Sequence, residues 1–160
     1  MFKGLSISVF FFLFTGCFGN GDLGGTGGAP GPIDGSWNLT SLTCNGSSNN
    51  LGGETQVLAV QGTAATQTGN LGSCQQTTPL TLEFLTSATL AAAAGNTSCS
   101  SGCNPSCGTA TPLPRLEYTY SVLGGSTLTW TRTAATAGED CPVGQTIVRH
   151  YSKATSLRLR

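Results

Sequence analysis

Charged side chains are scarce in this sequence: they make up 9% of its 160 residues, with seven basic groups against seven acidic ones. The lack of a basic excess argues against a nucleic-acid surface, because binding to phosphates needs clustered Lys and Arg. Lysine occurs only at Lys3 and Lys153. A helical bundle would be richer in Lys, Glu and Leu, whereas Gly, Thr and Ser dominate here. The composition therefore favours one small domain of strands and turns.

The sequence also lacks an arrangement of residues that is typical of catalysis. There is no G-x-S-x-G motif, and the single histidine, His150, is expected to face outward on its strand without a partner for nucleophilic catalysis. Asp34 and Asp140 fall in a linker and a loop, while Glu83 and Glu117 fall on polar strand faces. Without a pair of carboxylates in an apolar pocket, acid–base chemistry has no candidate. We expect a protein that is not an enzyme and needs no cofactor.

The N-terminus resembles an export signal. Leu5–Phe14 is an apolar run of about 15 Å as a helix, which is too short to span a bilayer but typical of a signal peptide. The following residues, Phe14–Cys17, resemble the lipobox of bacterial lipoproteins, with Phe in place of the usual Leu. The resemblance implies a signal peptide over 1–16 and a diacylglyceryl group on Cys17. The alternative is ordinary secretion, with cleavage near Gly16 and a free Cys17.

Three further segments follow the signal. Residues 17–34 are rich in Gly and Pro and are expected to form a flexible tether from the lipid-modified cysteine. Residues 35–153 are expected to form the folded domain, and 154–160 a short tail. Position 18 is Phe rather than the Asp associated with retention in the inner membrane. A lipoprotein of the outer membrane is therefore expected, with the membrane as its partner.

Short apolar runs alternate with Thr, Ser and Gln from residue 35 onward, which is the period of strands. Residues 87–94 fit either a strand or a helical turn, because Ala91–Ala94 favour helix. Gly124–Gly125 indicates a tight hairpin. We expect eight strands, over residues 36–44, 55–61, 63–69, 74–84, 87–94, 113–123, 126–133 and 145–152.

Eight sequential antiparallel strands can close into an up-and-down barrel. We call the end of the barrel at which the first strand ends the rim, and the opposite end the tether end. Because each strand reverses direction, six of the seven cysteines then fall at the rim, in agreement with disulfide pairing in an oxidising compartment. These cysteines are Cys44, Cys74, Cys99, Cys103, Cys107 and Cys141.

Barrel closure places the end of the first strand beside the start of the last, which predicts a Cys44–Cys141 disulfide. For the remaining four cysteines we expect Cys74–Cys99 with Cys103–Cys107. Cys74–Cys107 with Cys99–Cys103 is the alternative. The spacing Cys99-x₃-Cys103-x₃-Cys107 also suggests a metal site, but three further cysteines at the same rim favour disulfides and no metal.

The first strand opens with Gly35–Trp37, which resembles the G-x-W start of lipocalin barrels. The chain also resembles small lipocalin-like domains of bacterial lipoproteins in Cys141–Gln145, which leads into the last strand. The resemblance implies an all-β, eight-stranded lipocalin-like barrel. It also implies that Trp37 covers the closed end, with Arg149 of the last strand stacked across its indole.

Arg132 continues the face of Trp130 toward the rim, and Arg115 begins a neighbouring strand. These residues could form a cationic mouth for the carboxylate or phosphate of a small amphipathic ligand. Alternatively, both arginines reach solvent or pair with Glu139 and Asp140. Two function classes follow: a binding module for a small amphipathic or apolar ligand, or a structural or interaction lipoprotein whose barrel core is filled.

Overall fold

A computed structural model describes residues 31–50, 52–103, 114–137 and 139–155, and every regular element in these ranges is a strand. The elements are β1 (Gly35–Cys44), β2 (Ser47–Ser48), β3 (Thr55–Gln61), β4 (Ala64–Leu71), β5 (Cys74–Phe84), β6 (Thr89–Ala94), β7 (Ser98–Cys99), β8 (Leu116–Leu123), β9 (Thr127–Arg132) and β10 (Ile147–Lys153).

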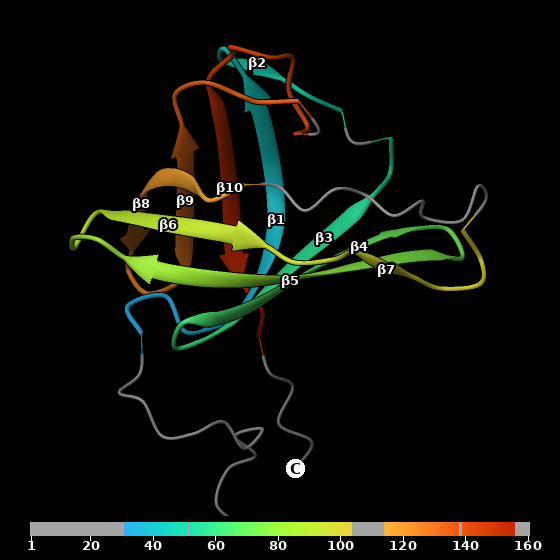
Figure 1. Ribbon diagram of the computed structural model, residues 1–160, viewed down its shortest axis with the longest axis horizontal. Coiled ribbons are helices and arrows are strands. Elements are labelled where there is room, and N and C mark those ends of the chain that lie inside the picture. The colour runs from blue at the N-terminus through green and yellow to red at the C-terminus, as the bar shows by residue number, and fades with distance from the viewer. Residues whose placement is uncertain (1–30, 51, 104–113, 138, 156–160) are drawn as a thin grey trace, which may run out of the picture.

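The strands form one antiparallel barrel (Figure 1). Neighbours follow the chain from β3 through β4, β5, β6, β8 and β9 to β10, and β1 joins β3 to β10. The β1–β10 register runs from Trp37 opposite Lys153 to Cys44 opposite Ile147 and closes the barrel. Two short strands, β2 and β7, extend the sheet at β1 and β5. The eight-stranded up-and-down barrel expected from the sequence is therefore confirmed.

All eight expected strands are present, as β1, β3, β4, β5, β6, β8, β9 and β10. Residues 89–94 form strand β6 rather than a helical turn, since β5 and β8 hydrogen-bond to its two edges. Their pairing outweighs the helix preference of alanine, because tertiary context overrides intrinsic propensity. Gly124 and Gly125 have φ values of 58° and 68°, the left-handed conformation that a two-residue hairpin of type I′ requires.

The hydrophobic core fills the half of the barrel next to the tether end. Trp37 lies in it, 1% exposed, and its indole Nε1 donates a hydrogen bond to the carbonyl of Ile33 (2.8 Å). Ile33 is itself fully buried, so residues 31–34 belong to the barrel and the tether predicted over 17–34 is too long by these residues. The core cluster consists of Ile33, Trp37, Leu58, Val60, Ala65, Leu82, Leu90, Ala92, Tyr120, Leu128, Trp130 and Tyr151.

The cation over Trp37 is not the one expected. Lys153 Nζ lies 5.2 Å from the centroid of the Trp37 ring, while Arg149 lies opposite Leu42. The β1–β10 register pairs Trp37 with Lys153, and four residues of strand separate Arg149 from that level by about 13 Å. The stacking of Arg149 on Trp37, implied by the lipocalin resemblance, is therefore wrong. Trp37 is buried at the closed end as that resemblance implied.

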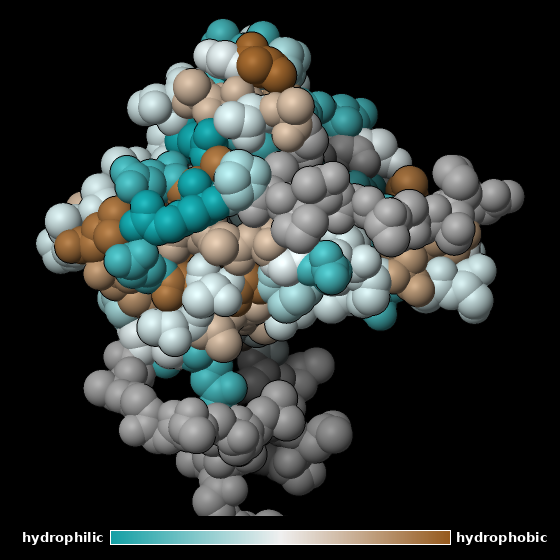
Figure 2. All heavy atoms as spheres, in the orientation of Figure 1, coloured by the Kyte–Doolittle hydropathy of each residue, from teal (hydrophilic) through white to brown (hydrophobic). Residues whose placement is uncertain are grey.

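Arg115 lies on the outer face of the barrel. Its guanidinium contacts Glu83 Oε2 at 2.8 Å and Glu117 Oε1 at 3.0 Å. Both carboxylates flank Ala91 in register, so the arginine bridges over this small residue and helps to bury it. Figure 2 shows hydrophilic residues gathered over this side of the molecule. Exposed pairs of this kind contribute little free energy, but they keep Arg115 away from the barrel interior.

The disulfides lie at the rim, as predicted. Cys44 is bonded to Cys141, which confirms that pairing. Cys74 is bonded to Cys103, so the expected Cys74–Cys99 pair and its alternative are both wrong. Cys99 is also disulfide-bonded. Cys107, like Cys17, lies outside the described residues.

The rim separates into two arms (Figure 1). One arm contains the last residues of β1 and β9, the first residues of β10, and β2. The Cys44–Cys141 disulfide joins β1 of this arm to the β9–β10 loop. The other contains the β4–β5 hairpin with β7, and carries Cys74–Cys103. β1 pairs with β3 only from Gly35 to Asn38, so the two strands diverge toward the rim. This divergence positions the candidate site.

Candidate functional site

The rim half of the barrel carries a polar cluster in place of an apolar cavity. Arg132 and Arg149 alternate with outward-facing residues of β9 and β10, on the same faces as Trp130 and Tyr151. Glu139 and Asp140 reach them from the β9–β10 loop, and Tyr118 joins them from β8. We call Tyr118, Arg132, Glu139, Asp140 and Arg149 the rim cluster.

Each arginine of the rim cluster has its own carboxylate. Arg132 Nε lies 3.2 Å from Glu139 Oε2 and donates a hydrogen bond to the carbonyl of Ala134 (2.7 Å). Glu139 Oε2 also accepts hydrogen bonds from the backbone N–H and hydroxyl of Thr136, at 2.6 and 3.0 Å. Arg149 Nη2 lies 2.8 Å from Asp140 Oδ2. The cluster is therefore neutral overall, which argues against capture of a free anion.

The Arg149–Asp140 pair is buried unevenly, which predicts unequal costs of mutation. The Arg149 side chain is 10% exposed and that of Asp140 is 31% exposed. Asp140→Asn leaves a buried guanidinium without a counter-charge and is expected to lower the free energy of unfolding by about 2–3 kcal/mol. Arg149→Met leaves a carboxylate that water reaches and keeps the packing of the barrel, so its expected cost is about 1 kcal/mol. Urea unfolding measures both, and a larger loss for Arg149→Met would contradict this asymmetry.

Aromatic rings surround the cationic groups. The Tyr118 and Trp130 centroids are 5.4 Å apart, and the Arg132 guanidinium carbon lies 5.9 Å from the centroid of Tyr118. Burial lowers the pKa of Arg149, but Tyr151 and Asp140 raise it by more, so the net pKa lies above its ordinary value. Burial raises the pKa of Tyr118. Arg149 therefore stays charged and Tyr118 neutral at physiological pH.

Burial raises the pKa of Tyr151 to about 12. In the unfolded chain this phenol ionises near pH 10, so the unfolded state loses its proton first. The contribution of Tyr151 to the free energy of unfolding is therefore fully present below about pH 10. It is lost as the pH rises toward 12, by roughly 2–3 kcal/mol in all. Unfolding free energies measured from about pH 9 to pH 11 should fall less steeply in Tyr151→Phe. Parallel curves for the two proteins would rule out this contribution.

Four buried polar atoms have no hydrogen-bond partner within the described part of the chain. They are Tyr120 Oη, Trp130 Nε1, Glu139 Oε1 and Arg149 Nε. Tyr120, Trp130 and Arg149 lie directly opposite one another on β8, β9 and β10, so three of the four belong to one row of side chains. Buried groups of this kind are costly unless water or a ligand satisfies them.

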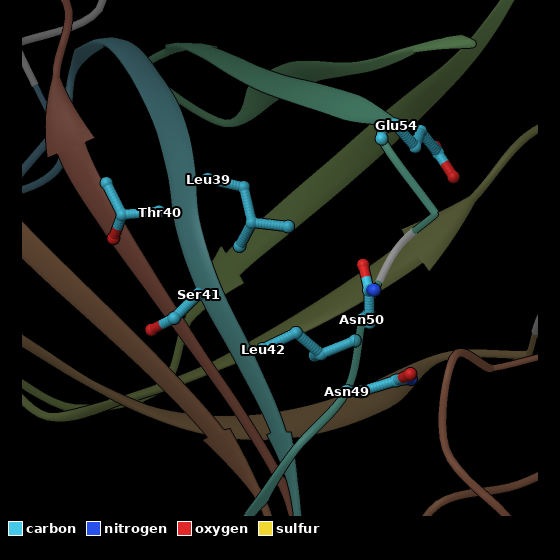
Figure 3. Close-up of a pocket in the computed structure, with 8 residues that line it drawn as sticks. Leu39, Thr40, Ser41, Leu42, Asn49, Asn50 and Glu54 are labelled. Carbon is cyan, nitrogen blue, oxygen red and sulfur yellow. The ribbon is translucent and has the colours of Figure 1, made fainter.

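A pocket of about 280 Å³ opens where β1 and β3 diverge. Figure 3 shows Leu39 and Leu42 pointing from β1 toward Asn50 and Asn49, while Thr40 and Ser41 lie on the other side of the strand. The full lining is Leu39, Thr40, Ser41, Leu42, Asn49, Asn50, Gly53 and Glu54. It combines two leucines with amide and carboxylate groups, and this combination suits a small ligand with an apolar and a polar part.

The pocket adjoins the rim cluster. Asn49 Nδ2 donates a hydrogen bond to the backbone carbonyl of Asp140 (2.8 Å). Leu42 lies opposite Arg149 in the β1–β10 register. A series of side-chain hydrogen bonds begins at Glu54 on the other side of the pocket. Glu54 Oε1 accepts from Gln56 Nε2 (3.2 Å), and Gln56 Oε1 accepts from Gln67 Nε2 (3.2 Å). Donors and acceptors thus follow the barrel wall on both sides of the pocket.

The cationic mouth predicted from Arg132, Arg115 and Trp130 is wrong in part. Trp130 is buried and Arg132 lies near it, but Glu139 neutralises Arg132, as the alternative interpretation expected. Arg115 does not join them, since it lies on the outer face. The Arg149–Asp140 pair was not predicted from the sequence, because it depends on the fold of the β9–β10 loop. Alternation signalled Arg149, between Ile147 and Tyr151, and Arg132, on the face of Trp130, as inward-facing.

Other candidate groups lie apart from the pocket. His150 Nδ1 is 3.1 Å from Thr129 Oγ1, on the face of β10 opposite Arg149. Asp34 Oδ1 accepts a hydrogen bond from the Gly62 N–H (2.9 Å) at the tether end. Among the residues described, no three His, Cys, Asp or Glu side chains converge to hold a metal ion.

None of the comparisons with known proteins found a relative: no family model, curated protein or solved structure matches this chain. Within the ranges that the structure covers, no helix is long and apolar enough to cross a membrane.

Proposed function

We propose that the protein is a lipid-anchored, non-catalytic module of the bacterial cell envelope that binds a small amphipathic ligand at the rim of its barrel. The anchor is the diacylglyceryl group on Cys17, and the outer membrane is the proposed location. The sequence features Phe14–Cys17 and Phe18 support this. Disulfides at the rim agree with an oxidising compartment. We also propose a lipocalin-like ancestry, on the basis of Gly35–Trp37 and the closed barrel.

The observation that carries ligand binding is the division of the barrel interior. The tether half is filled by packed apolar side chains, whereas the rim half has a pocket whose Leu42 lies opposite Arg149, a buried residue whose Nε has no partner in the described chain. An apolar part of the ligand would contact Leu39, while its polar part would hydrogen-bond to the amides of Asn49 and Asn50, which line the pocket. The neutral rim cluster favours an uncharged polar group over a carboxylate or phosphate.

Native mass spectrometry of the protein purified from its own membrane tests this function. The expected spectrum contains the lipid-modified chain with an additional small mass. Asn50→Trp places a large side chain at the pocket and should abolish the additional mass, whereas Ser48→Trp, on exposed β2 outside the pocket, should retain it. A wild-type spectrum without any bound molecule would contradict ligand binding.

A structural or interaction lipoprotein is the second candidate. Dense packing favours it, because eight large side chains have under 2% of their surface exposed. A barrel filled in this way is a rigid scaffold that needs no ligand. Under this candidate, the same spectra would contain a second protein chain and no small molecule.

A further inference from the structure

Exposed apolar side chains lie on two hairpins of the tether end. Leu123 is 76% exposed, Leu85 39% and Val122 37%. Leu85 follows β5, and Val122 and Leu123 end β8, so all three lie at the end of the barrel opposite the disulfides. Figure 2 shows hydrophobic spheres at the left edge of the molecule, where Figure 1 places the β5–β6 hairpin. Apolar side chains that gather at one end of a molecule in this way are typical of a surface that contacts a partner or a membrane.

Hydrogen bonds hold these hairpins together with both ends of the described chain. The Tyr120 N–H donates to the Ala88 carbonyl (2.8 Å), which joins the β5–β6 hairpin to β8. The Lys153 N–H donates to the Ser126 carbonyl (2.8 Å), which joins the β8–β9 hairpin to the end of β10. The Ala154 N–H donates to the Ser36 carbonyl (2.8 Å). The apolar tips, the start of β1 and the end of β10 thus share one end of the barrel.

We propose, on the basis of the lipid anchor proposed above, that this end docks on the bilayer, with Leu85, Val122 and Leu123 inserted at the level of the headgroups. The chain reaches the barrel at this end, and the 13 residues 18–30 would hold it about 20 Å from the modified Cys17. Short tethering raises the local concentration of lipid around the tips, so a few apolar side chains suffice for contact.

Charge favours an anionic lipid surface as the partner. Lys153 lies at the tether end, and the five residues after the described chain include Arg158 and Arg160. Asp34, an acidic residue at this end, accepts a hydrogen bond from the Gly62 N–H. Basic residues beside a membrane anchor are attracted to anionic headgroups. The pocket at the rim then opens away from the membrane.

Hydrogen exchange of the lipid-anchored protein tests the docking. In vesicles of phosphatidylethanolamine and phosphatidylglycerol, amides of 85–88 and 122–126 should exchange about tenfold more slowly than in the vesicle-free chain that begins at residue 18, as expected if the tips are inserted nine-tenths of the time. That shorter chain retains every strand, the core and both described disulfides. Rim amides of the β9–β10 loop should be unchanged, and equal exchange of the hairpins in both samples would overturn the docking.

Two double variants locate the contact. Val122→Ser with Leu123→Ser should lose the slower exchange of the hairpins in vesicles. Leu71→Ser with Val143→Ser is the matched control, since these exposed apolar residues lie at the rim, and it should keep the slower exchange. Slower exchange that persists in the first variant, or is lost in the control, would contradict insertion of these tips.

Attaching the protein to vesicles by a second route tests docking independently of the lipid anchor. The chain from residue 18 carries an N-terminal histidine tag and is bound to vesicles that contain nickel-chelating lipid. Docking predicts the same slower exchange of the hairpins on these vesicles, whether or not Cys17 is acylated in cells. The mass of the N-terminal peptide tests acylation by itself. An acylated Cys17 with unprotected hairpins on both kinds of vesicle would leave the anchor standing and overturn the docking.

Discussion

Replacing Cys44 and Cys141 together with serine is expected to lower the free energy of unfolding by about 4–5 kcal/mol. The disulfide joins residues 97 positions apart, so its removal frees a long loop in the unfolded chain. It also removes packing, because Cys141 lies in a small buried cluster with Leu42, Ala135 and Ile147. Urea unfolding followed by circular dichroism measures the loss.

The second disulfide is the matched control. Cys74 and Cys103 are 29 positions apart, so replacing both is expected to cost about 3.5 kcal/mol in the same chain-entropy model. The difference of about 1 kcal/mol depends on loop length rather than on the chemistry of the substitution. If loss of Cys74–Cys103 were the more damaging, the constraint on the unfolded chain would not be what makes Cys44–Cys141 important.

Trp37→Ala is expected to lower the free energy of unfolding by about 4 kcal/mol. The indole is almost completely buried, and its Nε1 donates to the carbonyl of Ile33. Truncation would leave a cavity at the closed end and an unsatisfied carbonyl beneath it. Thermal or urea unfolding gives the size of the loss.

Leu123→Ala serves as the comparison for the tryptophan. Leu123 is mostly exposed, so in the vesicle-free chain its truncation should change stability by less than about 0.5 kcal/mol. Trp37→Phe should fall between the two, because a ring remains while the hydrogen bond is lost. A cost for Trp37→Ala as small as that for Leu123→Ala would show that the closed end does not depend on the indole.

Most strands could be predicted because they carry a local signal, whereas 87–94 fitted a helical turn equally well. In β8 and β9, alternation assigns Tyr120, Leu128 and Trp130 to the interior, and Gly124–Gly125 determines the turn between them. The Cys44–Cys141 pairing followed from barrel closure alone. These features depend on local patterns or on topology, and both can be read from a sequence.

The second disulfide depends on a detail that no pattern reports. The short strand β7 places Cys99 opposite Gln76, two positions past Cys74 along β5. A turn, in which the Cys103 N–H donates to the Ser100 carbonyl (3.2 Å), then returns the chain to Cys74. A two-residue strand and one turn thus decide between Cys99 and Cys103. Neither has a recognisable sequence signal.

The level of Arg149 and its pairing with Asp140 were missed for a similar reason. The β1–β10 register pairs Trp37 with Lys153 and Leu42 with Arg149, and the lipocalin resemblance that placed Arg149 on Trp37 carries no information on this register. Glu139 and Asp140 reach the barrel because the β9–β10 loop folds back, with the Gly144 N–H donating to the Ala135 carbonyl (2.8 Å). Alternation predicted that Arg149 faces the barrel interior. It could not predict the residue opposite Arg149 on β1 or the ion pair with Asp140.

The pairing of the first strand with the last has a consequence for protein engineering. Gly35 and Lys153 lie within contact of each other, since Lys153 Cε is 3.0 Å from the position that a Cβ on Gly35 would occupy. A linker from the end of β10 to residue 31 would join the two ends of the barrel and keep Ile33 in the core, with new termini opened at Gly124–Gly125. Such a circular permutant would keep every strand pair and lose only the covalent turn between β8 and β9. A reporter protein fused to either new terminus would then lie at the position of this turn.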